Sequence, residues 1–293
     1  MTTDLKHEAV VLYSSEGDKI RTDVRYIKNG RKKPVLVFLH GFKGFKDWGP
    51  FPIVCERFAE QQFVAISFNF SHNGVSDQLT EFTELDRFAH NTVSTELREA
   101  HDVLAALLTG QIPIDESEFD PERIGIVGHS RGASLGILAG AHYHEVKAVS
   151  AWAPVSKFDR YTPRQKDKWK EEGYLEVMNS RTGQRMRMNA SFLDDLEKHH
   201  DRLDILKAAH QMTAGGKPLQ IISASEDLTA PPREAQEIKQ AAGAQHSEIH
   251  IIERTGHTFG VEHPFKGMTP AFDTAMAMTI DFFKRSFAHM SAG

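Results

Sequence analysis

A serine between two glycines is the most informative chemical feature of this chain. Ser130 lies in Gly-His-Ser-Arg-Gly, a G-x-S-x-G pentapeptide that follows the apolar stretch 123–127 and precedes a helical pattern. A sharp turn from strand into helix strains the serine and pushes its hydroxyl outward, and Gly128 and Gly132 prevent crowding around it. The pentapeptide predicts a serine nucleophile, although such glycine-rich turns also serve purely structural purposes.

A serine nucleophile needs a base that takes its proton and an acid that holds the base. His257 lies in Arg-Thr-Gly-His-Thr-Phe-Gly, directly after the predicted strand 247–254, and Asp227 follows the predicted strand 219–225. Both loops would lie at the carboxyl edge of a sheet, within reach of Ser130. Glu226 is a rival acid, and Asp227 is preferred because it is farther from the strand end and begins the turn.

The reaction also needs donors that stabilise a developing oxyanion, and two backbone N–H groups suffice. We expect one from Arg131, the residue after the nucleophile, and one from Phe42 in the turn His-Gly-Phe-Lys-Gly at 40–44. The glycines of this turn let its backbone approach the substrate closely. Lys43 and Lys46 flank the turn; they could favour an anionic acyl group, but we expect them to be solvated.

The predicted strands and helices must bring these loops to the same edge of a sheet. Near-continuous apolar runs alternate with amphipathic helical patterns, which is typical of a parallel sheet covered by helices on both faces. An antiparallel hairpin should begin the chain. The predicted strands are 7–13, 19–28, 34–39, 63–70, 123–128, 146–154, 219–225 and 247–254, and the predicted helices are 51–61, 96–109, one after Ser130, one that starts near 231, and 270–287.

The alternation stops after Pro154. We therefore predict one α/β core formed by residues 1–154 and 217–293, with a small cap, residues 155–216, inserted after the sixth strand. The cap should contain a hairpin around Ser180-Arg-Thr-Gly183 and a helix near 192–196. A substrate pocket between cap and core could be lined by aromatic side chains, for which ordinary packing is the alternative; the candidates are Phe42, Phe45, Trp48, Trp169 and Tyr174, together with Met178.

Composition narrows the function classes. The chain has 293 residues, is 40% hydrophobic and carries a formal net charge of -5, so it offers no broad basic face for nucleic acid. It shows no secretory leader and no stretch of ~18 apolar residues, which predicts a cytoplasmic protein without a membrane partner. The single cysteine, Cys55, is expected in the core, and the histidines lack a metal-ligand spacing, so neither a metal nor a cofactor is predicted. Nothing indicates the oligomeric state.

Taken together, these motifs resemble the α/β-hydrolase superfamily, in which nucleophile, acid and base follow one another as Ser130, Asp227 and His257 do here. Within it the chain is similar to dienelactone hydrolase-like proteins and to capped bacterial cinnamoyl or feruloyl esterases. The resemblance implies the α/β-hydrolase fold. Dienelactone enzymes use a cysteine nucleophile, however, and this chain has Ser130, which favours esters over lactones.

Three functions are consistent with the sequence. The favoured one is a serine carboxylesterase that acts on a small-molecule ester through an acyl-enzyme intermediate. An aminopeptidase of the same superfamily is the alternative, and it would need carboxylates such as Asp194, Asp195 and Glu197 near the pocket to bind a free ammonium group. A non-catalytic binding protein on the same scaffold is the third.

Overall fold

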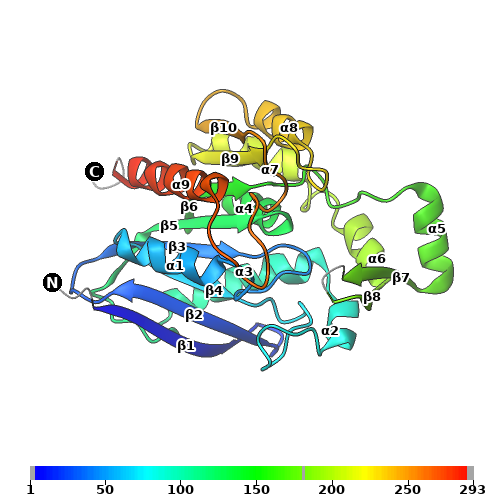
Figure 1. Ribbon diagram of the computed structural model, residues 1–293, viewed down its shortest axis with the longest axis horizontal. Helices are drawn as coiled ribbons and strands as arrows, with labels where there is room; N and C mark the ends of the chain where they lie inside the picture. Colours follow the sequence, from blue (N-terminus) through cyan, green and yellow to red (C-terminus); the bar gives the residue numbers. More distant parts are fainter. Residues whose placement is uncertain (1–3, 180–181, 289–293) are drawn as a thin grey trace.

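The structure is a computed structural model that describes residues 4–179 and 182–288. Its centre is an eight-stranded sheet in the order β1-β2-β4-β3-β5-β6-β9-β10 (Figure 1). The strands from β4 to β10 along this order pair in parallel, whereas β1, β2 and β4 pair antiparallel. The strands are β1 Leu5–Tyr13, β2 Lys19–Ile27, β3 Lys33–Leu39, β4 Val64–Phe68, β5 Phe119–His129, β6 Val146–Trp152, β9 Leu219–Ala224 and β10 Ser247–Ile252.

Helices cover both faces of this sheet, because parallel strands buried on both sides expose apolar side chains in both directions. Helices α1 (Phe51–Glu60) and α9 (Pro270–Ala288) pack on one face. The other face carries α3 (Val93–Leu108), α4 (Arg131–His142), α7 (Ile205–Ala214) and α8 (Pro232–Ala242). The short helix α2 (Leu85–Ala89) precedes α3. This is the predicted α/β arrangement.

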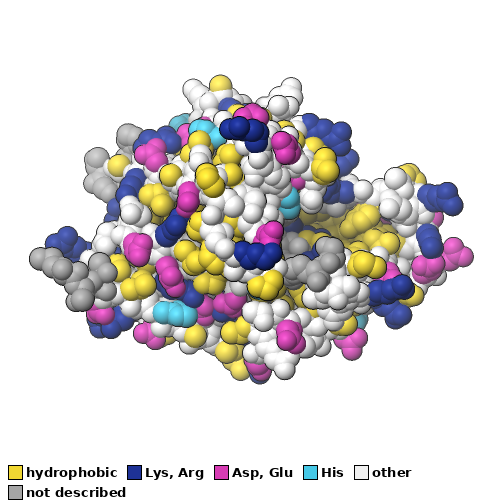
Figure 2. Space-filling model, in the orientation of Figure 1, with side chains coloured by type: hydrophobic (Ala, Val, Ile, Leu, Met, Phe, Trp, Pro, Cys, Tyr) yellow, Lys and Arg dark blue, Asp and Glu magenta, His cyan; other side chains and the backbone are white. Residues whose placement is uncertain are grey.

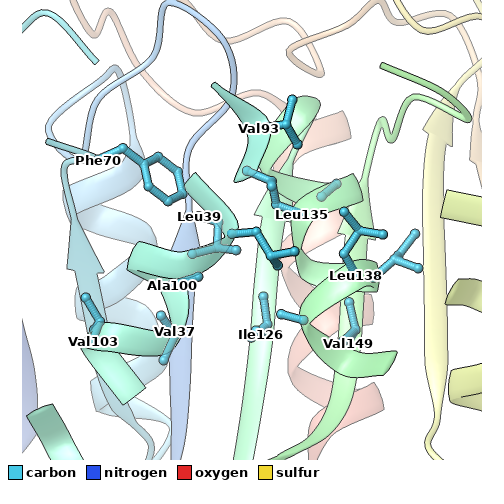
Figure 3. Packing of buried hydrophobic residues seen from close by; sticks show 14 of the residues in the cluster. Val37, Leu39, Phe70, Val93, Ala100, Val103, Ile126, Leu135, Leu138 and Val149 are labelled. Carbon is cyan, nitrogen blue, oxygen red and sulfur yellow. The ribbon is translucent and has the colours of Figure 1, made fainter. Parts of the chain in front are cut away.

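The packing beneath Ser130 is close and apolar. Figure 3 shows Val37 of β3, Ile126 of β5 and Val149 of β6 facing Leu135 and Leu138 of α4. All five side chains have an exposed fraction of 1% or less. The strand and helix that flank Ser130 are therefore fixed against each other by apolar packing, and the turn between them has little freedom.

A cap lies beyond the carboxyl ends of the strands, between β6 and β9 in the sequence (Figure 1). It contains α5 (Pro163–Glu172), the antiparallel hairpin of β7 (Tyr174–Asn179) and β8 (Gln184–Asn189), and α6 (Ser191–Lys198). Two residues of the predicted hairpin turn, 180 and 181, lie outside the described residues. Helix α7 packs against α4 and α8 of the core. We therefore propose that the cap ends before α7, earlier than residue 216.

Most strands and helices agree with the sequence prediction. The hairpin at the start of the chain and the cap hairpin are present, and the last helix runs from residue 270 to 288. Helices α2, α5 and α7 were not predicted. Helix α5 reads as a charged run because most of its side chains are exposed, and only Trp169 is buried.

Candidate active site

The turn at Ser130 is strained and closely packed. Ser130 follows β5 and precedes α4 with a φ of 57° and a ψ of -122°, a left-handed backbone that is rare for a residue with a side chain. A Cβ atom on Gly128 would lie 2.3 Å from the carbonyl oxygen of Gly132, and one on Gly132 would lie 2.3 Å from that of Leu39. No other residue fits at these two positions without a shift of backbone, so the glycines allow the turn.

The loop after β9 holds Asp227 in one orientation. Its carboxyl group is buried, and Oδ1 accepts hydrogen bonds from the backbone N–H groups of Thr229 and Ala230, both at 2.8 Å. Oδ2 lies 2.7 Å from Nδ1 of His257. Burial alone would raise the pKa of Asp227, but these hydrogen bonds outweigh it and hold the pKa below its usual value. Asp227 therefore remains an anion beside the imidazole, whereas its neighbour Glu226 is exposed.

His257 lies on the loop after β10, and its side chain is 20% exposed. The residue before the nucleophile, His129, binds this loop: its Nε2 lies 2.9 Å from the carbonyl oxygen of His257, and the two rings are 4.9 Å apart. Burial lowers the pKa of His129 to about 3, so the ring is neutral and Nε2 carries the donated proton. His129 thus fastens the loop that carries His257 to the turn that carries Ser130.

The turn at residues 40–44 lies directly against the nucleophile. A Cβ atom on Gly41 would be 3.0 Å from Cβ of Ser130 and 3.6 Å from the backbone nitrogen of Arg131. Burial lowers the pKa of His40 to about 4, and its Nδ1 lies 3.0 Å from the carbonyl oxygen of Gly41. A neutral His40 therefore donates from Nδ1 and fixes the turn that contains Phe42, next to the N–H of Arg131.

The two lysines of this turn are not both solvated, contrary to expectation. Lys46 is 4% exposed, and its ammonium group pairs with Asp23 and Asp47, both at 2.8 Å. Its role is structural. Lys43 reaches the cap, where its ammonium group donates to the carbonyl oxygen of Met178 at 3.0 Å.

The predicted aromatic lining divides into packed and accessible residues. Phe45 has no exposed surface and packs on Phe82, and Trp169 is 1% exposed and stacks on Phe192. Neither offers a surface to a substrate, so their burial does not support the predicted role. Phe42, Trp48 and Tyr174 are half-buried, and Met178 is 57% exposed. These four remain candidates.

A cavity of about 840 Å³ lies between the cap and the helices α7 and α8. Its wall includes the apolar side chains of Phe158, Leu193 and Leu196, and charged residues such as Arg233 and Glu237 stand around it. Figure 2 shows a hollow with hydrophobic side chains between core and cap. Ser130, Asp227 and His257 do not line this cavity.

One group of possible metal ligands occurs in the described part of the chain. Oxygen or nitrogen atoms of Asp18, His72 and Glu99 lie within 4.8 Å of one another. However, Asp18 pairs with Arg87 at 2.7 Å, and Glu99 accepts a hydrogen bond from the N–H of Ser71 at 2.8 Å. Both carboxylates have partners from the protein, so this group gives no basis for a metal centre.

Comparison with known proteins identifies the family. The model of the alpha/beta hydrolase family matches residues 36–270, most of the chain. The chain therefore belongs to this family, and it is a hydrolytic enzyme. No curated protein sequence matches it. No helix in the described residues has the length and apolar character needed to cross a membrane.

Solved structures resemble this fold along nearly its whole length. Est1E from Butyrivibrio proteoclasticus, with ferulic acid bound, is 15% identical, covers 97% of this chain and 100% of its own, and has a TM-score of 0.69. An esterase from Pyrobaculum calidifontis is 15% identical, with 96% and 85% covered and a TM-score of 0.67. A protein from Klebsiella pneumoniae named as a dienelactone hydrolase is 13% identical, with 96% and 98% covered and a TM-score of 0.62. At such identities the likeness shows the shared fold.

Sequence reasoning missed two residues of the site. His129 was read only as part of the pentapeptide, and its tie to the His257 loop depends on a contact between residues 128 positions apart. His40 was read as the start of a turn. Its position directly after an apolar strand was the available signal, but its neutral state follows from burial, which the sequence does not give.

Proposed function

We propose that this enzyme is a serine carboxylesterase with Ser130 as nucleophile, His257 as general base and Asp227 as the acid that orients the base. The observation that carries the proposal is the 2.7 Å hydrogen bond between Asp227 and His257, on a loop that His129 fastens to the nucleophile turn. A buried carboxylate on Nδ1 fixes the tautomer that leaves Nε2 free to accept a proton. That is the arrangement an alcohol nucleophile requires.

In the proposed reaction, His257 Nε2 takes the hydroxyl proton while Ser130 Oγ bonds to the ester carbonyl carbon. The carbonyl oxygen becomes an oxyanion that accepts hydrogen bonds from the N–H groups of Phe42 and Arg131. Collapse breaks the bond to the alcohol, which leaves with the proton from His257. Water then attacks the acyl-enzyme by the same route, releases the acid and restores Ser130.

The substrate class is proposed as small-molecule esters, including aromatic ones. The names of the similar structures support this, since they include esterases and one complex with ferulic acid. We propose that the apolar wall of the cavity between cap and core, which the three proposed catalytic residues do not line, binds an aromatic or aliphatic group of the substrate remote from the ester carbonyl. We propose that the cap selects this group and contributes no reacting group.

The peptidase alternative needs free carboxylates that could bind an ammonium group. Two of the three acids considered for that role already have partners in the protein: Glu197 pairs with Lys170 at 2.7 Å, and Asp195 accepts from the N–H of Ser94 at 3.1 Å. The third, Asp194, is exposed to solvent. This arrangement favours ester substrates over peptides with a free amino terminus.

The proposal is tested by activity against two substrate series. Purified enzyme is assayed with p-nitrophenyl esters of increasing acyl length and with aminoacyl-p-nitroanilides. We expect turnover of the esters, with kcat/KM at least about a hundredfold above any anilide, because the acids considered for an ammonium site are paired or solvent-exposed. Faster cleavage of the anilides, or no cleavage of any ester, would contradict the assignment.

A further inference from the structure

The side chain of Arg131 lies between the oxyanion turn and the cap. Its guanidinium carbon is 4.2 Å from the ring centroid of Phe42 and 5.2 Å from that of Phe192 on α6. The side chain is 11% exposed. Stacking of a guanidinium on aromatic rings is attractive and strengthens when water is excluded. Arg131 therefore joins two segments, residues 40–44 and α6, that are 150 residues apart in the sequence.

A third contact fixes the same side chain from the core. Nη1 of Arg131 lies 3.6 Å from Oε1 of Glu96 on α3. Glu96 is 4% exposed, and Asn91 donates to the same oxygen at 2.7 Å. Burial raises the pKa of Glu96, whereas the charge of Arg131 opposes that rise. The guanidinium group thus has one charged neighbour on α3 and two aromatic neighbours, one in the turn at residues 40–44 and one on α6.

The cap helix α6 is also held by a contact with α3. The N–H of Ser94, near the start of α3, donates to Oδ2 of Asp195 on α6 at 3.1 Å. Phe192 in turn stacks on Trp169 with ring centroids 5.9 Å apart and planes 8° apart, so its ring is fixed by the interior of the cap. A shift of α6 would therefore move the ring against which Arg131 rests.

We propose that Arg131 is a positioning residue whose side chain transmits the placement of cap helix α6 to the oxyanion hole. The inference rests on the proposed function, in which Arg131 and Phe42 supply the two N–H donors. The side chain of Arg131 contacts the ring of Phe42, so a single residue links both donors to the cap. Its role goes beyond its backbone N–H.

The effect can be large because oxyanion donors act only at short range. Loss of one donor lowers kcat by about 10²–10³-fold, and a displacement of about 1 Å can cost about 10²-fold. A cap that seats correctly would hold Phe192 against Arg131 and keep Phe42 in place. A displaced cap would leave Ser130 intact but would loosen the hole.

A double-mutant cycle on the complete enzyme tests this proposal. Arg131→Leu and Phe192→Leu, alone and together, are assayed for kcat and KM with p-nitrophenyl acetate and for inhibition by phenylboronic acid, whose adduct with the serine carries an oxygen in the oxyanion hole. Arg131→Lys asks whether charge alone suffices. Arg123→Leu is the matched control, because Arg123 also pairs with a carboxylate, Asp120 at 2.7 Å, but at the opposite end of β5.

We expect Arg131→Leu to lower kcat and boronate affinity in parallel by about 10- to 100-fold, with little change in KM. Phe192→Leu should lower kcat by about tenfold in the wild-type background and by less than about twofold beside Arg131→Leu, since the two residues act through one contact. Arg131→Lys should restore less than half of kcat. Arg123→Leu should leave kcat unchanged.

Three outcomes would overturn the inference. One is an Arg131→Leu enzyme with wild-type kcat and boronate affinity. Another is additive losses in the double variant, and the third is a loss of kcat in Arg123→Leu as large as that in Arg131→Leu, which would indicate general destabilisation. Absence of esterase activity in the wild-type enzyme would instead contradict the proposed function, so the two failures are distinguishable.

Discussion

The carboxyl edge of the sheet, which carries the proposed triad, and the cap beyond it are built in different ways. At the edge, backbone groups fix the chemistry: two N–H groups hold Asp227, a strained turn presents Ser130, and the His257 carbonyl is bound by His129. These hydrogen bonds are short, at 2.8–2.9 Å, and buried or partly buried. The side chains at this edge are therefore held in fixed positions. A reaction that depends on distances of a few ångströms requires this.

The cap is instead held by its own aromatic cluster and by a few polar contacts to the core. Tyr161, Trp169 and Phe192 pack together, and Trp169 donates to the carbonyl oxygen of Met188 at 2.8 Å. Outward links include Lys43 to Met178 at 3.0 Å and Gln184 to the carbonyl oxygen of Phe82 at 3.0 Å. The cap thus coheres through its own side chains, and its placement on the core depends on such single contacts, among them that of Phe192 with Arg131.

The largest effect is expected from substitution of the proposed catalytic residues at the sheet edge. Ser130→Ala and His257→Ala should each lower kcat by about 10⁶-fold, because the triad members act as a unit. The measurement is steady-state turnover of p-nitrophenyl butyrate, with thermal unfolding as a check that each variant folds. A folded variant that keeps more than about a tenth of wild-type turnover would remove that residue from the assignment, given losses of this size.

The next effect separates the two neighbouring acids. Asp227→Asn keeps the shape but reverses the hydrogen-bonding preference toward His257, so kcat should fall by about 10⁴-fold. Glu226→Gln is the matched control, since its side chain is exposed and should not matter. Turnover of both variants is compared at pH 7.5. If the Glu226 variant were the damaged one, the acid would have been assigned to the wrong residue.

A third prediction concerns the cap. Replacement of residues 158–203 by a short glycine-containing loop should reduce kcat/KM for a naphthyl or feruloyl ester relative to an acetyl ester by on the order of 10- to 100-fold, the range that apolar pockets provide. Loss of the contact between Phe192 and Arg131 affects both substrates and cancels in this ratio. An unchanged ratio in folded protein would mean that the cap does not select substrates.

The smallest effect tests a buried carboxyl group on α3, one helical turn after Glu96. Burial raises the pKa of Glu99 to about 7, above its ordinary value of 4.5. The folded state therefore binds more protons than the unfolded state between these values, and the free energy of unfolding should fall as the pH rises through this window, by up to about 3 kcal/mol.

The carboxyl group of Glu99 accepts hydrogen bonds from the N–H and the hydroxyl group of Ser71. Glu99→Gln should remove this fall, because the amide oxygen can accept from the N–H, the amide N–H can donate to the hydroxyl oxygen, and the side chain carries no charge to bury. Urea unfolding at pH 5, 6, 7 and 8 measures it for both proteins. Parallel pH profiles of the wild type and the variant would show that Glu99 does not titrate in this range.

The sequence was sufficient where local patterns determine structure. Apolar runs such as 34–39 and 219–224, set between amphipathic helical patterns, predict buried strands of a covered sheet. The glycines around Ser130 indicate a tight turn. Asp227 and His257 come directly after predicted parallel strands, so their loops could be placed at the carboxyl edge of the sheet from the order of the chain. The cap hairpin followed from alternation around a turn.

The remainder depends on contacts between distant residues. Phe45 and Trp169 have the residue type of a pocket lining, but type does not distinguish a packed ring from an accessible one. Lys46 looked solvated because nothing nearby in the sequence marks Asp23 as its buried partner. The contacts of the Arg131 side chain could not be predicted from the sequence, since its neighbours Glu96, Phe42 and Phe192 come from three separate segments.

The central claim is that the Asp227–His257 pair activates Ser130, and covalent labelling tests it most directly. The wild-type enzyme and the His257→Ala variant are treated with a fluorophosphonate, and the modified peptide is identified by mass spectrometry. The account predicts stoichiometric labelling of Ser130 in the wild type and a loss of labelling rate of at least about 10³-fold in the variant, since the serine is inert without its base. Labelling at another residue, no labelling of folded wild-type enzyme, or equal rates in both proteins would contradict it.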